Sequence, residues 1–369
     1  MGIWRSGLLA LPLLLTGVAQ AADPIRIAAV GPVTGPVAQY GDMQFSGVRL
    51  AVEQINAKGG VLGRPLEAVV LDDACEPKQA VAVANRVVNE GIEYVVGHLC
   101  SGSTQPASDV YVEEGVLMIT PASTSPQITA AGRPMLFRTI GLDSQQGKVA
   151  GEFIVDQVKP KRMAIIHDKQ QYGQGVADEV NRTVNARGLR PVLYEGVNKG
   201  QTDFSALITK LKSLGVDFVY YGGYHPELGL LLRQSRAQGF DARFMGPEGV
   251  GHKDISAIAG AASEGLLVTL PADFAQDPVN ADLVKALQAK GEDASGPFVM
   301  PSYAAVQVIA EAMEKAKSTD PEKVAKVLYA STFNTPIGEV AFDEKGDLKN
   351  FRFVIFEWHA DGNKTPITQ

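Results

Sequence analysis

The sequence predicts an α/β protein of two lobes, each a doubly wound parallel sheet, and three observations support this fold class. Short β-branched runs alternate with amphipathic helical stretches, which is typical of βα units around a parallel sheet. The alternation restarts near residue 143, after the irregular stretch 137–143. The chain of 369 residues is also too long for one ordinary hydrophobic core and suits two domains.

The first lobe opens with alternating strands and helices. In its second helix, Pro77 stands where a first turn tolerates proline, and Gly91 stands at the end. Val81, Ala84 and Val88 recur between them at helical spacing, so one face of the helix should pack on the sheet. The expected strands are 25–30, 66–71, 93–97 and 117–119, and the expected helices are 44–56 and 78–90.

The second lobe repeats this order. Its expected strands are 162–167, 192–195, 218–222 and 265–270, and its expected helices are 144–158, 174–186, 204–214 and 227–238. After Pro271, the helices 304–317 and 321–329 precede short strands that end within 351–358. Composition alone does not assign this last part of the chain to either lobe.

The N-terminus has the parts of a secretory signal peptide. Arg5 precedes the uncharged apolar run 7–18, which leads into small residues at 19–22. This run is shorter than the roughly 20 residues that span a bilayer, and no later stretch is long and apolar enough. Cleavage after Ala21 or Ala22 leaves no cysteine at the new N-terminus to carry a lipid. We therefore expect residues 1–22 to be removed from a soluble periplasmic protein that is not lipid-anchored.

The charge of the chain argues against nucleic acid as a partner. The formal net charge is −7, and it becomes −8 once Arg5, the only charged residue of 1–22, is removed. An acidic protein of this kind is repelled by phosphate backbones.

The two cysteines, Cys75 and Cys100, both lie in the exported part of the chain. An even number of cysteines in an oxidising compartment usually means a disulfide. The alternative is a reactive catalytic thiol, which needs an activating base that neither flank supplies. The compartment therefore favours a structural disulfide.

Signatures of catalysis and metal binding are absent from the sequence. It contains no GxxxxGK[ST] phosphate loop, no GxSxG nucleophile turn and no HExxH zinc motif. Its five histidines do not fall at metal-ligand spacing: His98, His167, His225, His252 and His359. We therefore expect neither enzymatic activity nor a cofactor nor a metal.

Polar residues gather instead where strands are expected to end, and this is where doubly wound sheets bind ligands. Segment 99–106 (LCSGSTQP), which contains Ser101, opens a helix and favours an anion such as a carboxylate, although helix capping explains it equally well. Segment 121–126 (PASTSP) offers a carbonyl and a hydroxyl to a cation, or is a plain loop. Segment 246–249 (GPEG) places the Glu248 carboxylate at a strand end, or is an exposed turn.

Four aromatic residues stand in glycine-containing segments that we expect to be loops: Tyr40, Tyr172, Tyr224 and Phe298. Aromatic residues in loops often serve only to pack a surface or a lid. They do not by themselves define a site.

Five longer blocks of sequence are familiar as a set: 72–75 (DDAC), 97–101 (GHLCS), 165–173 (IIHDKQQYG), 220–224 (YYGGY) and 244–251 (FMGPEGVG). Together they resemble the periplasmic leucine/isoleucine/valine-binding proteins, over about residues 25 to 358. In that family two similar lobes, joined by three crossovers, close over one amino acid. The resemblance implies crossovers near Ile140, Pro271 and Asn350. It assigns 23–142 and 272–350 to lobe one, and 143–271 and 351–369 to lobe two.

The resemblance also implies a ligand site. Ser101, Ala122 and Thr124 of lobe one would surround the carboxylate and ammonium of the amino acid, and Glu248 of lobe two would neutralise the ammonium. The four aromatic residues named above would surround its side chain. The two cysteines would be bonded to each other.

The sequence departs from the family pattern at two places in the wall that would surround the side chain of the ligand. Tyr40 stands where some members carry tryptophan, and Met300 and Pro301, near Phe298, also differ. A smaller wall would admit alanine or threonine beside leucine, isoleucine and valine, because one methylene discriminates by only about 1–3 kcal/mol. The order of affinities among these ligands stays open.

The resemblance implies a monomeric, non-enzymatic carrier that delivers L-leucine, L-isoleucine or L-valine to an inner-membrane ABC permease. The alternative is a sensor domain of the same fold that reports an amino acid or amide to a signalling partner. The lack of a membrane or effector segment in the sequence weighs against a sensor.

Overall fold

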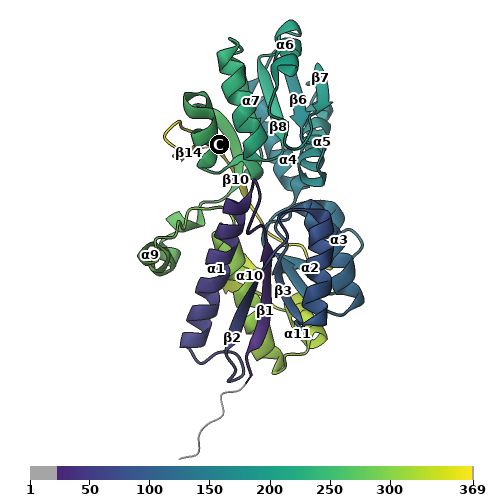
Figure 1. Cartoon of the computed structure of the whole chain (residues 1–369), viewed down its shortest axis with the longest axis vertical. Helices are drawn as coiled ribbons and strands as arrows, with labels where there is room; N and C mark the ends of the chain where they lie inside the picture. The colour runs from purple at the N-terminus through teal and green to yellow at the C-terminus, as the bar shows by residue number, and fades with distance from the viewer. Residues whose placement is uncertain (1–22, 368–369) are drawn as a thin grey trace, which may run out of the picture.

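A computed structural model describes residues 23–367 and contains two α/β lobes that follow one another along the long axis of the molecule (Figure 1). The expected signal peptide, residues 1–22, lies outside the described residues. Within the described part of the chain, no helix is both long enough and apolar enough to cross a membrane.

The first lobe is built on a five-stranded sheet whose neighbouring strands are all parallel, in the order β2-β1-β3-β4-β5. Its strands are β1 (Ile25–Gly31), β2 (Leu66–Asp72), β3 (Tyr94–Gly97), β4 (Leu117–Thr120) and β5 (Leu136–Arg138). Its helices are α1 (Ala38–Ala57), α2 (Pro77–Asn89), α3 (Ser101–Glu113), α10 (Val299–Ala316) and α11 (Pro321–Ala330).

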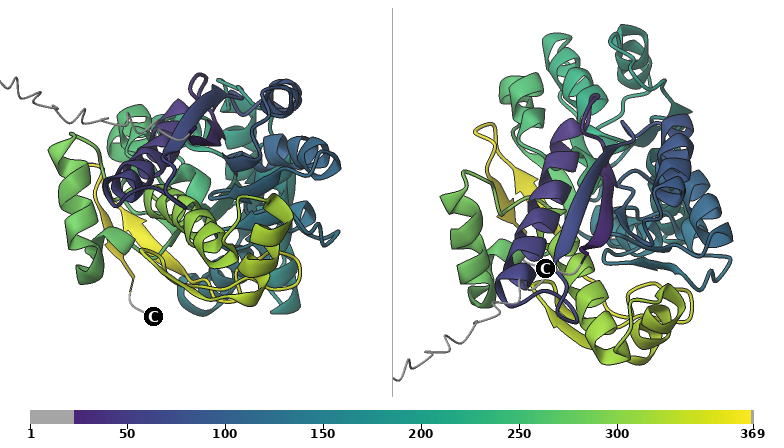
Figure 2. Two further views of the ribbon diagram at one scale, coloured as in Figure 1. Left: turned by 90° about the horizontal axis from the view of Figure 1, so that it is seen from below. Right: turned by 60° about the horizontal axis from the view of Figure 1, so that its bottom comes forward.

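Helices cover both faces of this sheet, so its strands are apolar throughout. Ile25 and Ile27 of β1 pack into the core formed with α1, α10 and α11. Ala28 and Val30 point to the opposite face, where α2 and α3 lie. The helix α10 comes from the last part of the chain and packs along α1, as Figure 2 shows.

The second lobe is built on a seven-stranded sheet in the order β14-β13-β10-β9-β8-β6-β7. Its strands are β6 (Met163–His167), β7 (Leu193–Gly196), β8 (Phe218–Gly222), β9 (Arg243–Gly246), β10 (Leu266–Pro271), β13 (Phe353–Trp358) and β14 (Lys364–Pro366). Helices α4 (Asp143–Phe153) and α5 (Gln171–Ala186) cover one face. Helices α6 (Ser205–Ser213), α7 (His225–Ala237) and α8 (Asp254–Ala259) cover the other.

The second sheet is parallel, as expected, except at one edge. Strand β13 runs antiparallel to β10, and β14 runs antiparallel to β13. The pairing of Pro271 with Phe353 explains this, because the chain leaves the second sheet at one end of β10 and returns to it at the same end.

The chain passes between the two sheets three times. The first crossing lies between β5 and α4, the second follows β10, and the third precedes β13. The two-lobed fold with three crossovers is therefore confirmed. The residue boundaries assigned to each lobe stay a prediction.

The remaining elements are short or lie at the edges of the lobes. They are the helix α9 (Ala281–Ala289), the hairpin strands β11 (Phe333–Thr335) and β12 (Gly338–Val340), the 3-10 turns η1 (Pro126–Ile128), η3 (Glu248–Val250), η4 (Gly260–Ser263), η5 (Phe274–Gln276) and η6 (Pro278–Asn280), and the π-helical turn η2 (Ile154–Val158).

Four helices begin at least two residues earlier than the sequence predicts. Helix α1 begins at Ala38 rather than 44, α5 at Gln171 rather than 174, α7 at His225 rather than 227, and α10 at Val299 rather than 304. Glycine, proline and aromatic residues in these first turns look like a loop in sequence, yet a first turn tolerates proline at its start. The extra turns carry residues of the candidate site.

Candidate functional site

The candidate site lies where strands of both sheets end and the two lobes touch. Segments after β3 and β4 come from the first sheet, and η3 follows β9 of the second sheet. The Thr124 hydroxyl donates a hydrogen bond across the lobes to Glu248 Oε1, at 3.4 Å. The Tyr40 hydroxyl likewise donates to the Gly249 carbonyl, at 2.8 Å. This is the strand-end position at which doubly wound sheets bind ligands.

The first wall of the site is the start of α3. Ser101 is the first helical residue and is 1% exposed. Its hydroxyl accepts a hydrogen bond from the Ser125 N–H at 3.3 Å, and the residue before it, Cys100, makes no side-chain cap. The helix-capping explanation of this segment is therefore wrong for Ser101. A buried helix start with a hydroxyl can accommodate a carboxylate.

The segment 121–125 is held rigidly beside that helix start. The Arg138 guanidinium donates to the Ser123 carbonyl at 2.7 Å and to the Ser125 carbonyl at 3.2 Å. Arg138 is itself buried and ion-paired with Asp347, Nε to Oδ1 2.5 Å. Ala122 and Thr124 are buried as well, so this segment is not the plain surface loop that the sequence left open.

Glu248 faces this segment from the second lobe. It is 2% exposed, which excludes the exposed-turn explanation. Its Oε1 accepts from Thr124, whereas Oε2 has no hydrogen-bond partner within residues 23–367. Burial raises the pKa of Glu248 to about 7. A buried carboxylate of this kind is poised to gain a cationic partner.

Asp143 also lies in the candidate site, and the sequence interpretation missed it. It begins α4, is fully buried, and its N–H donates to the Thr124 carbonyl at 2.9 Å. Neither carboxylate oxygen finds a hydrogen-bond partner in the described chain. Burial, and then the charge of Glu248, raise the pKa of Asp143 well above its usual range. Its position shortly after a predicted strand could have marked it as a candidate ligand contact. In the sequence interpretation it served only to mark the boundary between the lobes.

The four aromatic residues do come together, and two of them, Tyr224 and Phe298, lie on loops as expected. Tyr40 and Tyr172 lie in the first turns of α1 and α5, and Tyr224 and Phe298 directly precede α7 and α10. The rings of Tyr40 and Phe298 are 5.4 Å apart, and those of Tyr172 and Tyr224 are 5.2 Å apart. The Gly249 N–H donates to the Tyr172 hydroxyl at 2.9 Å.

The disulfide Cys75–Cys100 is present, as expected. Its Cα atoms are 5.5 Å apart. It joins the segment after β2 to the residue that precedes α3. Both sulfur-bearing residues belong to the buried cluster that contains the four aromatic rings and Ala122. The disulfide is therefore part of the apolar wall of the site.

Two histidines also surround Tyr40, and the sequence interpretation considered them only as metal ligands. The ring of His225 lies 5.4 Å from that of Tyr40, and the ring of His252 lies 5.7 Å from it. Burial lowers the pKa of His225 to about 3 and also lowers the pKa of His252. Both rings are therefore neutral at ordinary pH. No cluster of three or more metal-ligating side chains occurs in the described residues.

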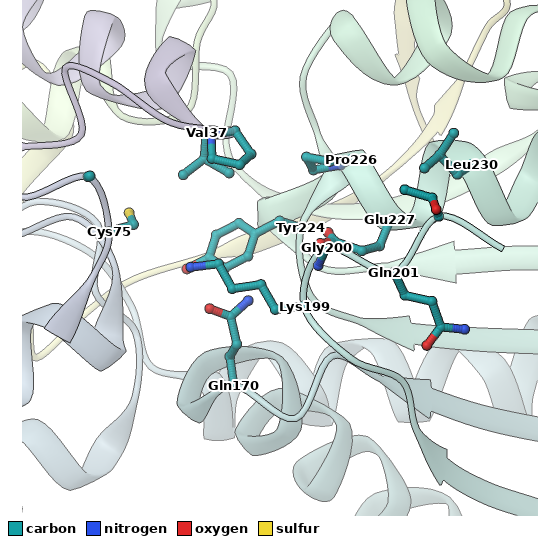
Figure 3. Close-up of a pocket in the computed structure, with 13 residues that line it drawn as sticks. Val37, Cys75, Gln170, Lys199, Gly200, Gln201, Tyr224, Pro226, Glu227 and Leu230 are labelled. Carbon is teal, nitrogen blue, oxygen red and sulfur yellow. Dashed lines mark hydrogen bonds between the residues drawn. The ribbon is translucent and has the colours of Figure 1, made fainter. Parts of the chain in front are cut away.

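A separate cavity of about 250 Å³ lies beside the disulfide and Tyr224 (Figure 3). Cys75 and Tyr224 line it, and its other lining residues come from both lobes. Its lining includes neither Ser101 nor Glu248. Lys199, which lines the cavity, forms an ion pair with Glu76 of the other lobe, Nζ to Oε1 2.5 Å. The cavity is therefore distinct from the polar site.

The fold and the site define a two-lobed α/β binding protein that encloses a small ligand between its lobes. The chain belongs to the periplasmic binding protein family, whose sequence profile matches residues 24–363. The family expected from the sequence is confirmed.

Three similar proteins specify the relationship further. Over 347 residues the chain is 62% identical to the leucine-, isoleucine-, valine-, threonine-, and alanine-binding protein of Pseudomonas aeruginosa, covering 94% of this chain and 93% of that protein. Over 344 residues it is 53% identical to the Leu/Ile/Val-binding protein of Escherichia coli, covering 93% of each. The crystal structure of a leucine-binding protein from Thermotoga maritima matches with a TM-score of 0.86 and 29% identity, covering 93% of this chain and 98% of that one.

Proposed function

We propose that this protein is the substrate-binding component of an ABC importer and carries branched-chain aliphatic L-amino acids, namely leucine, isoleucine and valine. It is a binding protein rather than an enzyme, as its family is. The observation that carries the proposal is the buried contact between Glu248 of one lobe and Thr124 of the other. The relatives support a periplasmic location.

In the proposed pose the polar end of the amino acid lies between the lobes. Its carboxylate meets the start of α3 and Ser101, where the helix dipole favours a negative charge. Its ammonium meets the Ala122 carbonyl, the Thr124 hydroxyl and the Glu248 carboxylate. A buried ammonium requires such a counter-charge, since an unpaired buried charge is very costly.

The side chain of the ligand would lie against the four aromatic rings and the disulfide. These residues form one buried apolar cluster. A wall of this kind favours aliphatic side chains and offers no counter-charge to lysine, arginine or aspartate. Because the relative from Pseudomonas aeruginosa is named for threonine and alanine as well, we include both as further ligands.

Binding would be coupled to closure of the lobes. The contacts Thr124–Glu248 and Tyr40–Gly249 both cross from one lobe to the other. A ligand that touches both lobes stabilises the closed form more than the open form and shifts the population toward it. We propose that the closed monomer then docks on an inner-membrane permease.

Calorimetric titration with every common L-amino acid tests the ligand class. Leucine, isoleucine and valine should bind far more tightly than aspartate, lysine and arginine. Tight binding of a charged amino acid, with leucine and valine silent, would reject the proposal. Uptake of labelled leucine in cells that contain the permease tests the carrier role, and leucine binding without any support of uptake would point to a sensor.

A further inference from the structure

Two buried carboxylates flank the same threonine. Glu248 Oε1 accepts from the Thr124 hydroxyl at 3.4 Å, and the Asp143 N–H donates to the Thr124 carbonyl at 2.9 Å. Both acidic residues are at most 2% exposed. Three of their four carboxylate oxygens have no hydrogen-bond partner among residues 23–367. Such unpartnered buried groups are rare in native proteins and call for an explanation.

Among residues 23–367, the cation whose charge acts on Asp143 is Arg138. Arg138 is already ion-paired with Asp347 and bonded to the carbonyl groups of segment 121–125, so it does not neutralise both carboxylates. Two carboxyl groups buried beside the same threonine cannot both ionise without a large cost in free energy.

We propose that Asp143 and Glu248 share one proton in the empty site, and that the ammonium of the bound amino acid replaces this proton. Asp143 is then a second counter-charge that positions the ammonium, beside Glu248. The carboxyl O–H bond of the pair breaks on binding, its electron pair stays on the oxygen, and the proton passes to the solvent. The ligand enters with its ammonium intact. This inference rests on the proposed function.

The other titratable groups that face the pair do not compete for this proton. On α5 and β8, burial raises the pKa of the Tyr172 and Tyr220 hydroxyls well above their usual range, so both stay neutral. His225, at the start of α7, lies beyond Tyr40 and has a pKa of about 3 because of burial. Glu179 on α5 adds a further negative charge, which favours the protonated form of Asp143.

Tyr224, before α7, and Tyr40, on α1, complete the set of titratable groups that face Glu248. Burial raises the pKa of both hydroxyls well above the usual range, so they stay neutral too. His252 lies beyond Tyr40, and burial lowers its pKa. At neutral pH, already above the usual pKa of histidine, His252 is uncharged as well. A proton released there is therefore assigned to the carboxylate pair.

The consequence is a pH-dependent affinity. If one proton leaves for each ligand bound, affinity rises with pH by up to tenfold per unit below the pKa of the pair, and levels off above it. Burial raises the pKa of Glu248 to about 7, so the change falls in the weakly acidic range.

Calorimetry of leucine binding in two buffers of different ionisation enthalpy counts the protons released. At weakly acidic pH the wild-type protein should release close to one proton per leucine. The Asp143→Asn and Glu248→Gln proteins should bind leucine more weakly and should release almost no protons on binding. Glu179→Gln, which removes a neighbouring carboxylate outside the pair, should keep the release. The hydroxy acid analogue of leucine, which has no ammonium, should bind weakly and release no proton.

Leucine binding by the wild-type protein without proton release across the weakly acidic range would overturn the shared proton. Undiminished release by a folded Asp143→Asn protein would overturn the role of Asp143. The wild-type measurement decides the first point even if this variant does not fold. If leucine does not bind to the wild-type protein at all, the proposed function fails rather than the proton exchange.

Discussion

The change Glu248→Gln isolates the charge on which the proposed site depends. Glu248 is 2% exposed and meets Thr124 of the opposite lobe at 3.4 Å, so the side chain lies away from solvent screening. Glutamine keeps its size and an oxygen acceptor but removes the counter-charge of the ammonium. Loss of one partner of a buried charge pair costs roughly 2–5 kcal/mol, which is about 30-fold to several-thousand-fold in affinity for leucine.

The stability of the empty protein should not fall with the affinity. Burial raises the pKa of Glu248 to about 7, which means that the ionised side chain is unfavourable in the native protein. The Glu248→Gln protein should therefore have a Tm at or above that of the wild type. A fall in affinity with no fall in Tm would show that Glu248 contacts the ligand and is not needed for the stability of the fold.

Calorimetric titration with leucine measures the affinity, and small-angle scattering measures compaction on adding leucine. The exposed Glu344 provides a matched control, since Glu344→Gln makes the same chemical change away from the site. If Glu248→Gln binds leucine within threefold of the wild type and still compacts, the assignment of the site is wrong.

Three further predictions concern the same site. Ser101→Ala should weaken leucine binding by about 1–3 kcal/mol, less than Glu248→Gln, because the backbone N–H groups at the start of α3 remain; a larger loss than in Glu248→Gln by calorimetry would contradict the pose. Replacing Cys75 and Cys100 together by serine should lower the free energy of unfolding by about 3 kcal/mol, since the disulfide closes a loop with a sequence separation of 25; an unchanged Tm would refute this. The contribution of Glu248 to the stability of the empty protein should decrease as pH rises from about 4.5 to about 7, because the native protein holds the proton that the unfolded chain has lost. Denaturant unfolding across this range should show a difference between the wild type and Glu248→Gln that grows with pH.

Local sequence patterns were sufficient to predict most of the helices and strands. Strand β8 has the predicted bounds 218–222, because a buried apolar run between turn residues has few alternatives. The starts of α1 and α10 were harder, since their first turns carry residues that also occur in loops. In α10, Pro301 lies inside the helix, in a first turn that needs no N–H from it.

The candidate site depends on contacts that no local pattern contains. Thr124 and Glu248 are separated by 124 positions in the sequence. Before the structure, only the family resemblance predicted that they belong to one site. Asp143 was missed because its importance comes from its burial beside Glu248, which a sequence window does not reveal. His225 was missed because it acts as a buried neutral ring beside Tyr40 rather than as a metal ligand.

The most direct test of the account is a crystal structure of the protein with leucine. We expect the leucine carboxylate at the start of α3, and the ammonium within hydrogen-bonding distance of Thr124, Glu248 and Asp143. We expect the side chain against Tyr40 and Phe298. Leucine bound instead in the cavity that Cys75 and Tyr224 line, with Glu248 free of contact, would contradict the central claim.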